Sequence, residues 1–317
     1  MSTLPRSPNS SRVTTYELPV VTPYRLDLTV SALRRTTANP VDVYTTDGRY
    51  LRALGGFGEP VVVSVPQPRA DALAVSMVGS AADTDRALAC VRRLLGTERD
   101  VSEFHREAQA IPWLAPLARR MLGLKPPRYP ELFEACANVI VFQQLSLQSA
   151  SAIMGRLLRA LGTTVQHDGV PLAVFPSDEA FLRADDVALR AAGLSAGKLA
   201  TLRRVAEAIA SGGISEAILE QRSSPDASLL LRGIKGIGPW TATVILLRGL
   251  GRLDVFPPDD SSVAANFTLV GGGTVDAGSA VETLGSQRGM LYFLLLLARL
   301  EARGEIGRPT SGEHSVT

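Results

Sequence analysis

The sequence predicts an α+β fold, in which a small N-terminal α/β domain with an antiparallel sheet precedes a larger all-α region. Short β-rich segments occupy residues 25–78, and helical periodicity dominates from residue 101 onward. With 317 residues, of which 45% are hydrophobic and 20% charged, the chain is long enough for two domains and a sizeable core. We expect the N-terminal domain over 14–100, the helical region over 101–304, and disordered tails at 1–13 and 305–317.

The N-terminal domain is predicted from five short strands and one helix. The pair Asp47-Gly48 is a turn signal between two of the strands, and Leu88, Val91 and Leu94 give the helix one apolar face. The expected strands are 25–30, 41–44, 50–54, 61–65 and 73–78, and the expected helix is 83–95. Strands this short and this close in sequence favour an antiparallel sheet, and its expected role is that of a scaffold.

The second region is predicted to be helical throughout. Its apolar residues recur at helical spacing, and polar or glycine-bearing breaks separate the segments. The expected helices are 101–110, 113–122, 130–142, 146–161, 178–192, 196–210, 216–220, 228–234 and 240–248. An all-α region therefore follows the sheet.

Composition excludes several classes of function. The formal net charge is only +2, so affinity for a polyanion would need a local basic face. Two cysteines, Cys90 and Cys136, are too few for a four-cysteine iron–sulfur cluster, and three widely separated histidines make a zinc site unexpected. The longest apolar run, 290–298, is too short to cross a bilayer, and the N-terminus lacks the apolar core of a signal peptide. We expect an intracellular protein without a membrane partner.

The most informative segment, 231–262, joins two helical stretches through a glycine-bearing turn. Leu231 and Ile234 have apolar helical spacing, Gly236 and Gly238 lie in the turn, and Pro239 opens the second helix at its favoured first position. The first amides of such a helix have no intrahelical partner and suit a phosphate group. Glycine also ends many helices that touch no ligand, so the turn by itself leaves both interpretations open.

The residues after the turn are more specific. Trp240-Thr241-Ala242 opens an apolar helix, and the segment DVFPPDD comes next over 254–260. With this combination the chain resembles the helix-hairpin-helix (HhH-GPD) DNA glycosylases, of the 3-methyladenine DNA glycosylase II (AlkA) type. The segments VFQQLS at 141–146 and AGLSAGKL at 192–199 support the resemblance, which covers about residues 16–300.

The resemblance implies that Asp260 is the catalytic carboxylate. A carboxylate can stabilise the positive charge that builds on deoxyribose when an N-glycosidic bond breaks, and it can orient the attacking water. The alternative is that Asp259 or Asp260 caps the following helix. Members that also cleave the DNA strand carry a Schiff-base lysine where this chain has Trp240, so the resemblance implies a monofunctional enzyme. Lys235 and Lys198 do not match that position, and we interpret them as phosphate contacts or solvated charges.

The resemblance also implies how DNA is held. The backbone at Gly236, Gly238 and Thr241, with Lys235, is expected to contact phosphates, and Gln144 matches the residue inserted into the duplex where the base is turned out. Gln144 is alternatively an ordinary polar loop residue, or a buried glutamine that satisfies backbone groups.

The base pocket departs from the family pattern. Trp240 is expected to stack on the extruded base, or to pack on the hairpin. Two further aromatic positions of the family's pocket correspond to Val244 and Gln287, which thins the pocket. Arg288 is expected to contact DNA, to support Asp260 or to form a structural ion pair.

Cofactor expectations are correspondingly few. The carbonyls of Arg232, Ile234 and Ile237 match positions that hold a monovalent cation, Na⁺ or K⁺, in the family. No other cofactor is implied.

The expected function is that of a monofunctional DNA glycosylase. It would hydrolyse the N-glycosidic bond of alkylated purines of the 3-methyladenine type by base flipping, and so initiate base excision repair. Its expected partner is double-stranded DNA with damaged bases, and we expect a monomer in the bacterial cytoplasm or nucleoid. A glycosylase for deaminated or other modified bases, and a helix-hairpin-helix DNA-binding protein without catalysis, are the alternatives.

Overall fold

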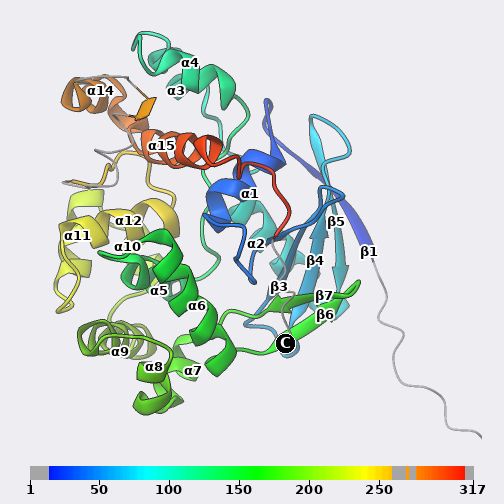
Figure 1. Cartoon of the computed structure of the whole chain (residues 1–317), viewed down its shortest axis with the longest axis vertical. Coiled ribbons are helices and arrows are strands. Elements are labelled where there is room, and N and C mark those ends of the chain that lie inside the picture. Colours follow the sequence, from blue (N-terminus) through cyan, green and yellow to red (C-terminus); the bar gives the residue numbers. More distant parts are fainter. Residues whose placement is uncertain (1–13, 259–268, 271–275, 311–317) are drawn as a thin grey trace, which may run out of the picture.

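The computed structural model describes residues 14–258, 269–270 and 276–310 (Figure 1). A five-stranded antiparallel sheet forms the N-terminal part, in the order β1-β5-β4-β3-β2. Its strands are β1 (Thr14–Pro19), β2 (Val43–Tyr44), β3 (Tyr50–Leu54), β4 (Val61–Val65) and β5 (Ala72–Val78). Four of these strands were predicted to within two residues at each end, whereas β1 was not predicted.

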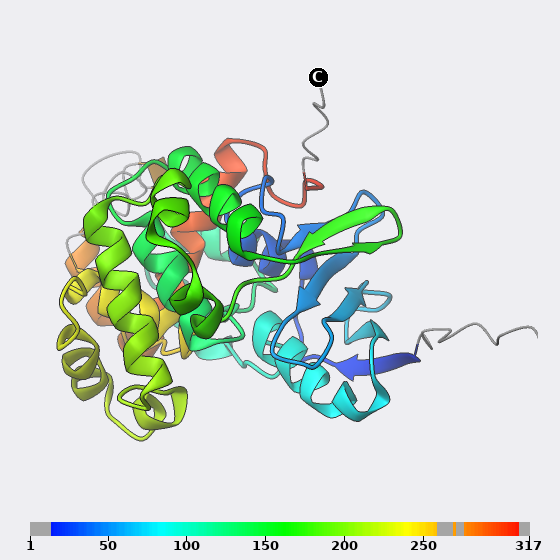
Figure 2. The same cartoon turned by 90° about the horizontal axis from the view of Figure 1, so that it is seen from below.

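Both faces of the sheet are covered. On one face Tyr50, Val63 and Val75 pack with helices α1 (Leu26–Arg34) and α2 (Thr84–Leu95) in a single apolar cluster. On the other face Leu51 and Val62 pack against a two-stranded hairpin, β6 (Thr164–His167) and β7 (Val170–Ala173), which extends from the helical region (Figure 2). Strands β3 and β4 are buried along their whole length for this reason.

The segment predicted as the strand 25–30 is instead the start of helix α1, so that prediction was wrong. Its alternation of polar and apolar residues misled because the helix is buried on nearly all sides. The polar residues are satisfied internally: Thr29 Oγ1 accepts from the amide of Lys125 at 3.1 Å, and Ser31 Oγ accepts from the amide of Gly307 at 3.1 Å. Because Thr29 and Ser31 are buried together with the apolar residues, the helix has no polar, solvent-facing side to mark it.

The remaining chain is mainly helical, as predicted. Its helices are α3 (Ser102–Ala108), α4 (Ala115–Arg120), α5 (Leu132–Phe142), α6 (Leu147–Leu161), α7 (Asp178–Arg183), α8 (Asp186–Ala191), α9 (Ala196–Ala210), α10 (Glu216–Glu220), α11 (Ser224–Arg232), α12 (Pro239–Gly249), α14 (Ala277–Thr283) and α15 (Gly289–Ala302). Short 3₁₀ turns lie at Ala81–Asp83 and Gly285–Gln287. The single helix predicted at 178–192 is two helices, because Asp185 caps α8 by accepting from the amide of Ala188.

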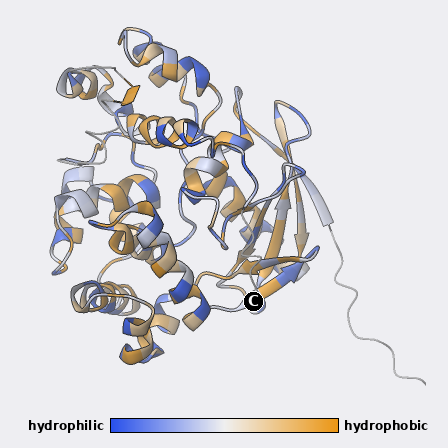
Figure 3. Cartoon of the chain, viewed as in Figure 1, coloured by the Kyte–Doolittle hydropathy of each residue, from blue (hydrophilic) through white to orange (hydrophobic). Residues whose placement is uncertain are grey.

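The helices pack around α5, α12 and α15. Helix α5 contacts α6, α9 and α12, and its residues belong to the largest apolar cluster. Helix α15 lies in a second cluster with α3 and α4. Both α12 and α15 are largely apolar (Figure 3). Within the residues that the structure places, no helix is long and apolar enough to cross a membrane.

Buried polar contacts join the sheet to the helices. Arg52 on β3 binds Asp42 at 2.6 Å and Glu134 on α5 at 2.5 Å. Arg248 on α12 donates to the carbonyls of Ala32 and Leu33 at the end of α1. These buried charged contacts cross the junction between the two parts, and they fix the orientation of the helical region relative to the sheet.

Candidate nucleic-acid interface

The turn between α11 and α12 is built around two glycines with different roles. Gly236 has φ +105°, and a Cβ there would lie 2.0 Å from Thr201 Oγ1 on α9, so the turn packs directly on that helix. Gly238 has an ordinary extended backbone, φ −91° and ψ −179°, and no atom lies within 4 Å of a Cβ built there. The space beside Gly238 is therefore open to an incoming group.

Helix α12 begins without a side-chain cap. Gly238 occupies the N-cap position and offers no side-chain acceptor, while Pro239 follows at the start of the helix. The first amides of a helix carry the positive end of its dipole. Thr241, however, is only 3% exposed, and its hydroxyl accepts a hydrogen bond from the side-chain amide of Gln143. The open side of the turn therefore lies at Gly238 rather than at the side chain of Thr241.

Basic side chains accompany the turn. Arg232 and Lys235 are exposed, and Arg204 on α9 donates to the carbonyl of Lys235 at 3.2 Å. The carbonyl of Ile234, one of the three predicted cation ligands, accepts from the amide of Ile237 at 3.0 Å. No cluster of three or more His, Cys, Asp or Glu side chains that could hold a metal ion is found in the described part of the chain.

The loop 143–146, between α5 and α6, lies beside the hairpin. Gln144 is exposed and has φ +52°, a left-handed conformation that is uncommon outside glycine. Leu145 is 40% exposed, and unlike its exposed neighbours Gln144 and Ser146 it is apolar. We did not single out Leu145 from the sequence, although an apolar residue inside a polar loop was the available signal.

Lys198 makes contacts that the sequence did not indicate. Its partly buried ammonium donates to the carbonyl of Val141 at 2.7 Å and to that of Gln143 at 2.8 Å. Burial lowers the pKa of Lys198. The residue therefore ties the first turn of α9 to the end of α5 and to the loop that carries Gln144.

The four residues predicted for the base pocket lie in different surroundings. Trp240 is half-buried and packs against the main apolar cluster, whereas Val244 is 0% exposed within that cluster. A base would reach Val244 only after a rearrangement. Gln287 donates to Glu103 Oε2 at 3.2 Å, and Arg288 donates through Nε to the carbonyl of Gly285 at 2.6 Å.

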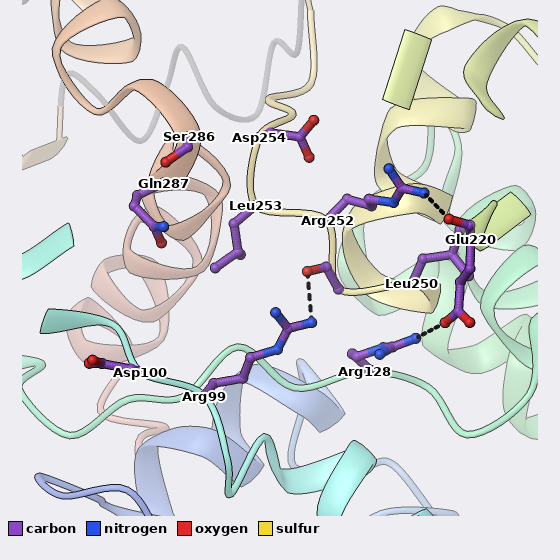
Figure 4. Close-up of a pocket in the computed structure, with 11 residues that line it drawn as sticks. Arg99, Asp100, Arg128, Glu220, Leu250, Arg252, Leu253, Asp254, Ser286 and Gln287 are labelled. Atoms are coloured by element: carbon purple, nitrogen blue, oxygen red, sulfur yellow. Dashed lines mark hydrogen bonds and ion pairs between the residues drawn. The ribbon is translucent and has the colours of Figure 1, made fainter. Parts of the chain in front are cut away.

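A cavity of about 480 Å³ lies at the C-terminal end of α12, the end opposite the hairpin (Figure 4). Arg99, Arg128 and Arg252 line it together with Glu220, Asp254 and Gln287. The three arginines donate to backbone carbonyls, as Arg99 does to that of Gly251 at 3.1 Å. Burial, with the nearby charges of Arg93 and Arg99, lowers the pKa of Arg128 to about 10. Arg128 binds the last residue of α12, whereas Arg252 binds the carbonyl of Leu219 in α10. Because the arginines are engaged in these contacts and carboxylates accompany them, the cavity has the character of a structural junction.

Asp259 and Asp260, the capping and catalytic candidates, lie outside the described residues. Asp254, five residues before Asp259, lines the cavity just described.

Comparison with known proteins shows a likeness to one family. Residues 137–283 match the model of the HhH-GPD superfamily base excision DNA repair proteins. The matched stretch contains the loop 143–146, helix α9, the hairpin and the segment that carries Asp260. This part of the helical region is therefore similar to that superfamily.

Individual relatives agree with the family. The chain is 32% identical over 173 residues to the DNA-3-methyladenine glycosylase of Bacillus subtilis, across 55% of this chain and 57% of that protein. It thus spans little more than half the length of this curated relative.

Solved structures extend the likeness to the whole fold. A 3-methyladenine DNA glycosylase from Archaeoglobus fulgidus superposes with a TM-score of 0.77 at 24% identity, over 90% of this chain and 99% of that one. The 3-methyladenine DNA glycosylase of Schizosaccharomyces pombe in complex with abasic DNA matches with a TM-score of 0.51 at 26% identity, over 62% of this chain and 96% of that one. The predicted fold class, a sheet-bearing N-terminal part followed by a helix-hairpin-helix region, is confirmed.

Proposed function

We propose that this protein is a monofunctional DNA glycosylase that releases alkylated purines of the 3-methyladenine type from duplex DNA and so starts base excision repair. The observation that carries the proposal is the hairpin: its turn leaves open space at Gly238, and it lies beside an exposed loop that carries Gln144 and Leu145. The names of the relatives, which are 3-methyladenine glycosylases, support the choice of substrate.

The hairpin supplies the hold on DNA. Its backbone at Gly238 and the exposed side chains of Lys235 and Arg232 suit phosphates, which carry no sequence information. This suits an enzyme that must search undamaged DNA, because the contact is the same at every step. The loop 143–146 then fills the gap that an extruded base leaves.

The chemistry rests on Asp260. As the C1′–N bond breaks, its electron pair stays on the alkylated base, which leaves as a neutral molecule because the methylated purine was cationic. Positive charge develops on the deoxyribose and is stabilised by the carboxylate of Asp260. The same carboxylate orients the water that adds to C1′ and accepts the proton that this water loses. Trp240 stands where strand-cleaving relatives of this superfamily carry a lysine, so the reaction ends at an abasic site.

We propose double-stranded DNA with damaged bases as the partner of a monomeric, intracellular protein. A monovalent cation, Na⁺ or K⁺, on the carbonyls of Arg232, Ile234 and Ile237 would stiffen the turn and add positive charge next to the phosphate.

The decisive test is the pair of neighbouring variants Asp260→Asn and Asp259→Asn. Asp260→Asn should lower base release from methylated DNA by roughly 100-fold or more, in line with loss of a preorganised electrostatic group, while DNA affinity is retained. Asp259→Asn should retain activity. Single-turnover release of free base, measured by chromatography, checks both variants, and equal rates for wild type and Asp260→Asn would refute the assignment.

A second test separates hydrolysis from lyase chemistry. Incubation of the protein with methylated duplex and borohydride should trap no covalent adduct, and the DNA strand should break only after alkali, because no lysine occupies the position of Trp240. A strand-cleaving glycosylase run in parallel confirms that trapping works, and an adduct on any lysine of this chain would make the enzyme bifunctional.

A further inference from the structure

Helix α9 contacts both elements that the proposed function assigns to DNA. Lys198, in its first turn, binds the carbonyls of Val141 and Gln143 at 2.7 and 2.8 Å. Thr201, one turn later, packs on Gly236 so closely that a Cβ would lie 2.0 Å from its hydroxyl. Arg204, one further turn along, donates to the carbonyl of Lys235 at 3.2 Å. The spacing of three residues places these side chains along one stripe of the helix.

The loop 143–146 is attached to the rest of the molecule from two directions. Lys198 binds it from α9, and the side chain of Gln143 donates to the hydroxyl of Thr241 in the first turn of α12. Immediately after these attachments, Gln144 adopts φ +52° and Leu145 reaches the surface. An unusual backbone conformation persists where its surroundings fix it, and here the surroundings are these bonds.

We propose that Lys198 is a positioning residue, whose ammonium fixes the position of the loop 143–146 relative to the hairpin. With the loop in this position, Gln144 and Leu145 enter the duplex when the hairpin binds phosphate. The proposal rests on the proposed function for the identity of the ligand, duplex DNA. It assigns to Lys198 an action on the protein's own loop, in place of the phosphate contact that a lysine in this region would otherwise suggest.

The chemistry of the contact favours a fixed geometry. The carbonyl of Val141 is one of the last in α5, and a cation at a helix C-terminus satisfies such carbonyls and interacts favourably with the helix dipole. Bonds from a charged donor are stronger than neutral ones. Because two donors of one ammonium are used on carbonyls two residues apart, the side chain is less available to a phosphate than an exposed lysine is.

Lys198→Met removes the ammonium and keeps an apolar chain, Lys198→Arg keeps a charged donor, and Lys235→Met is the matched control, since it removes the same charge from an exposed site on the hairpin. Fluorescence anisotropy measures affinity for an intact duplex and for a duplex with a tetrahydrofuran abasic analogue, each at several salt concentrations. Single-turnover release of base from methylated DNA is measured in parallel, and circular dichroism checks folding.

We expect Lys198→Met to bind intact duplex as wild type does and to lose most of the preference for the abasic duplex. Its rate of base release should fall by about tenfold or more, since small displacements of positioning groups have effects of this size. Lys198→Arg should restore most of the preference. Lys235→Met should weaken binding to both duplexes equally and reduce the log–log salt slope by about 0.9.

Two results would overturn the inference. Equal weakening of Lys198→Met on both duplexes, with the salt slope of Lys235→Met, would make Lys198 a phosphate contact. An unchanged preference for the abasic duplex in Lys198→Met, or no such preference in the wild type, would show that the loop does not depend on Lys198 or does not enter DNA. If Lys198→Met does not fold, Thr241→Val removes the other attachment and should reduce the same preference.

Failure of the proposed function has a different signature. A wild type that releases no base from methylated DNA, yet prefers the abasic duplex in a manner that depends on Lys198, would refute the alkylpurine assignment and leave the positioning role intact.

Discussion

Gly236 and Gly238 are two residues apart in the same turn, yet the structure gives them opposite constraints. Gly236 has a left-handed backbone, and a Cβ on it would point at the hydroxyl of Thr201. Gly238 faces outward, with a backbone that any residue adopts and with empty space around it. The first glycine is required by the fold, so a requirement for the second must come from something outside the protein.

This difference predicts different outcomes for two single methyl additions. Gly238→Ala should leave the fold and stability nearly unchanged and weaken binding of intact and lesion-bearing duplexes alike, because the methyl occupies the space where a phosphate approaches the backbone. Gly236→Ala should lower the free energy of unfolding by roughly 1–3 kcal/mol or more, from the strained backbone and the displaced Thr201. Denaturant unfolding and anisotropy measure the two effects. A folded Gly238→Ala protein that binds DNA as tightly as wild type would remove the hairpin from the interface.

The sequence indicated the hairpin and its neighbours well at the level of single residues. The glycine turn, Pro239 at the start of α12 and the exposure of Lys235 and Gln144 follow from local rules and from the motif. The partner of Lys198 did not follow, because its acceptors lie 55 and 57 residues away and are backbone carbonyls, which every residue carries. Val244, which motif position predicts at the base pocket, is fully buried in the main apolar cluster, and its part in a pocket stays a prediction.

At the scale of elements, local patterning succeeded where a short apolar strand is bounded by turn residues and where a helix has one apolar face. Helix α2 was predicted to within one residue, and the predicted bounds of strands β3 and β4 agree with those of the structure. Patterning failed for α1, whose polar residues are buried and bonded to distant chain segments. The hairpin of β6 and β7 was also missed, because its apolar residues are few and gain their burial only by packing on the sheet.

The loop between α5 and α6 yields a prediction that separates its two exposed residues. Apolar side chains act as wedges between base steps, whereas a glutamine can replace base-pair hydrogen bonds. Leu145→Ala should therefore weaken the preference for an abasic duplex whichever base stands opposite, and Gln144→Ala should weaken it to an extent that varies with that base. Affinities for duplexes with each of the four bases opposite the analogue decide between them.

Gln148→Ala serves as the control for this comparison, because Gln148 is exposed in the first turn of α6. It should bind the four abasic duplexes as wild type does. If Gln144→Ala and Leu145→Ala both behave like this control, the loop does not enter the duplex.

At the scale of the whole molecule, the sheet and the helical region meet at a buried charge cluster. Arg52 binds Asp42 and Glu134, and Tyr50 donates to Asp42 at 2.8 Å. Arg52 and Glu134 are 82 residues apart and come from different parts of the fold, so sequence patterns did not indicate the pair. Two carboxylates share one guanidinium, and burial raises the pKa of Glu134 from 4.5 to about 7.

The raised pKa predicts how stability changes with pH. Between about pH 4.5 and 7 the native state holds a proton on Glu134 that the unfolded chain releases, so the contribution of this residue to stability is fully present below pH 4.5 and is lost as the pH rises through 7. Glu134→Gln, a neutral side chain of the same shape that still accepts from Arg52, removes this dependence. The difference in free energy of unfolding, wild type minus Glu134→Gln, should therefore fall with rising pH across this window, by at most about 1.4 kcal/mol per pH unit.

Urea unfolding at half-unit pH steps measures this difference. Glu207→Gln, at an exposed position of α9, is the control that should show no such slope. A difference that stays constant from pH 4.5 to 7 would mean that Glu134 is already ionised across the window. Arg52 would then compensate the negative charges of both Asp42 and Glu134.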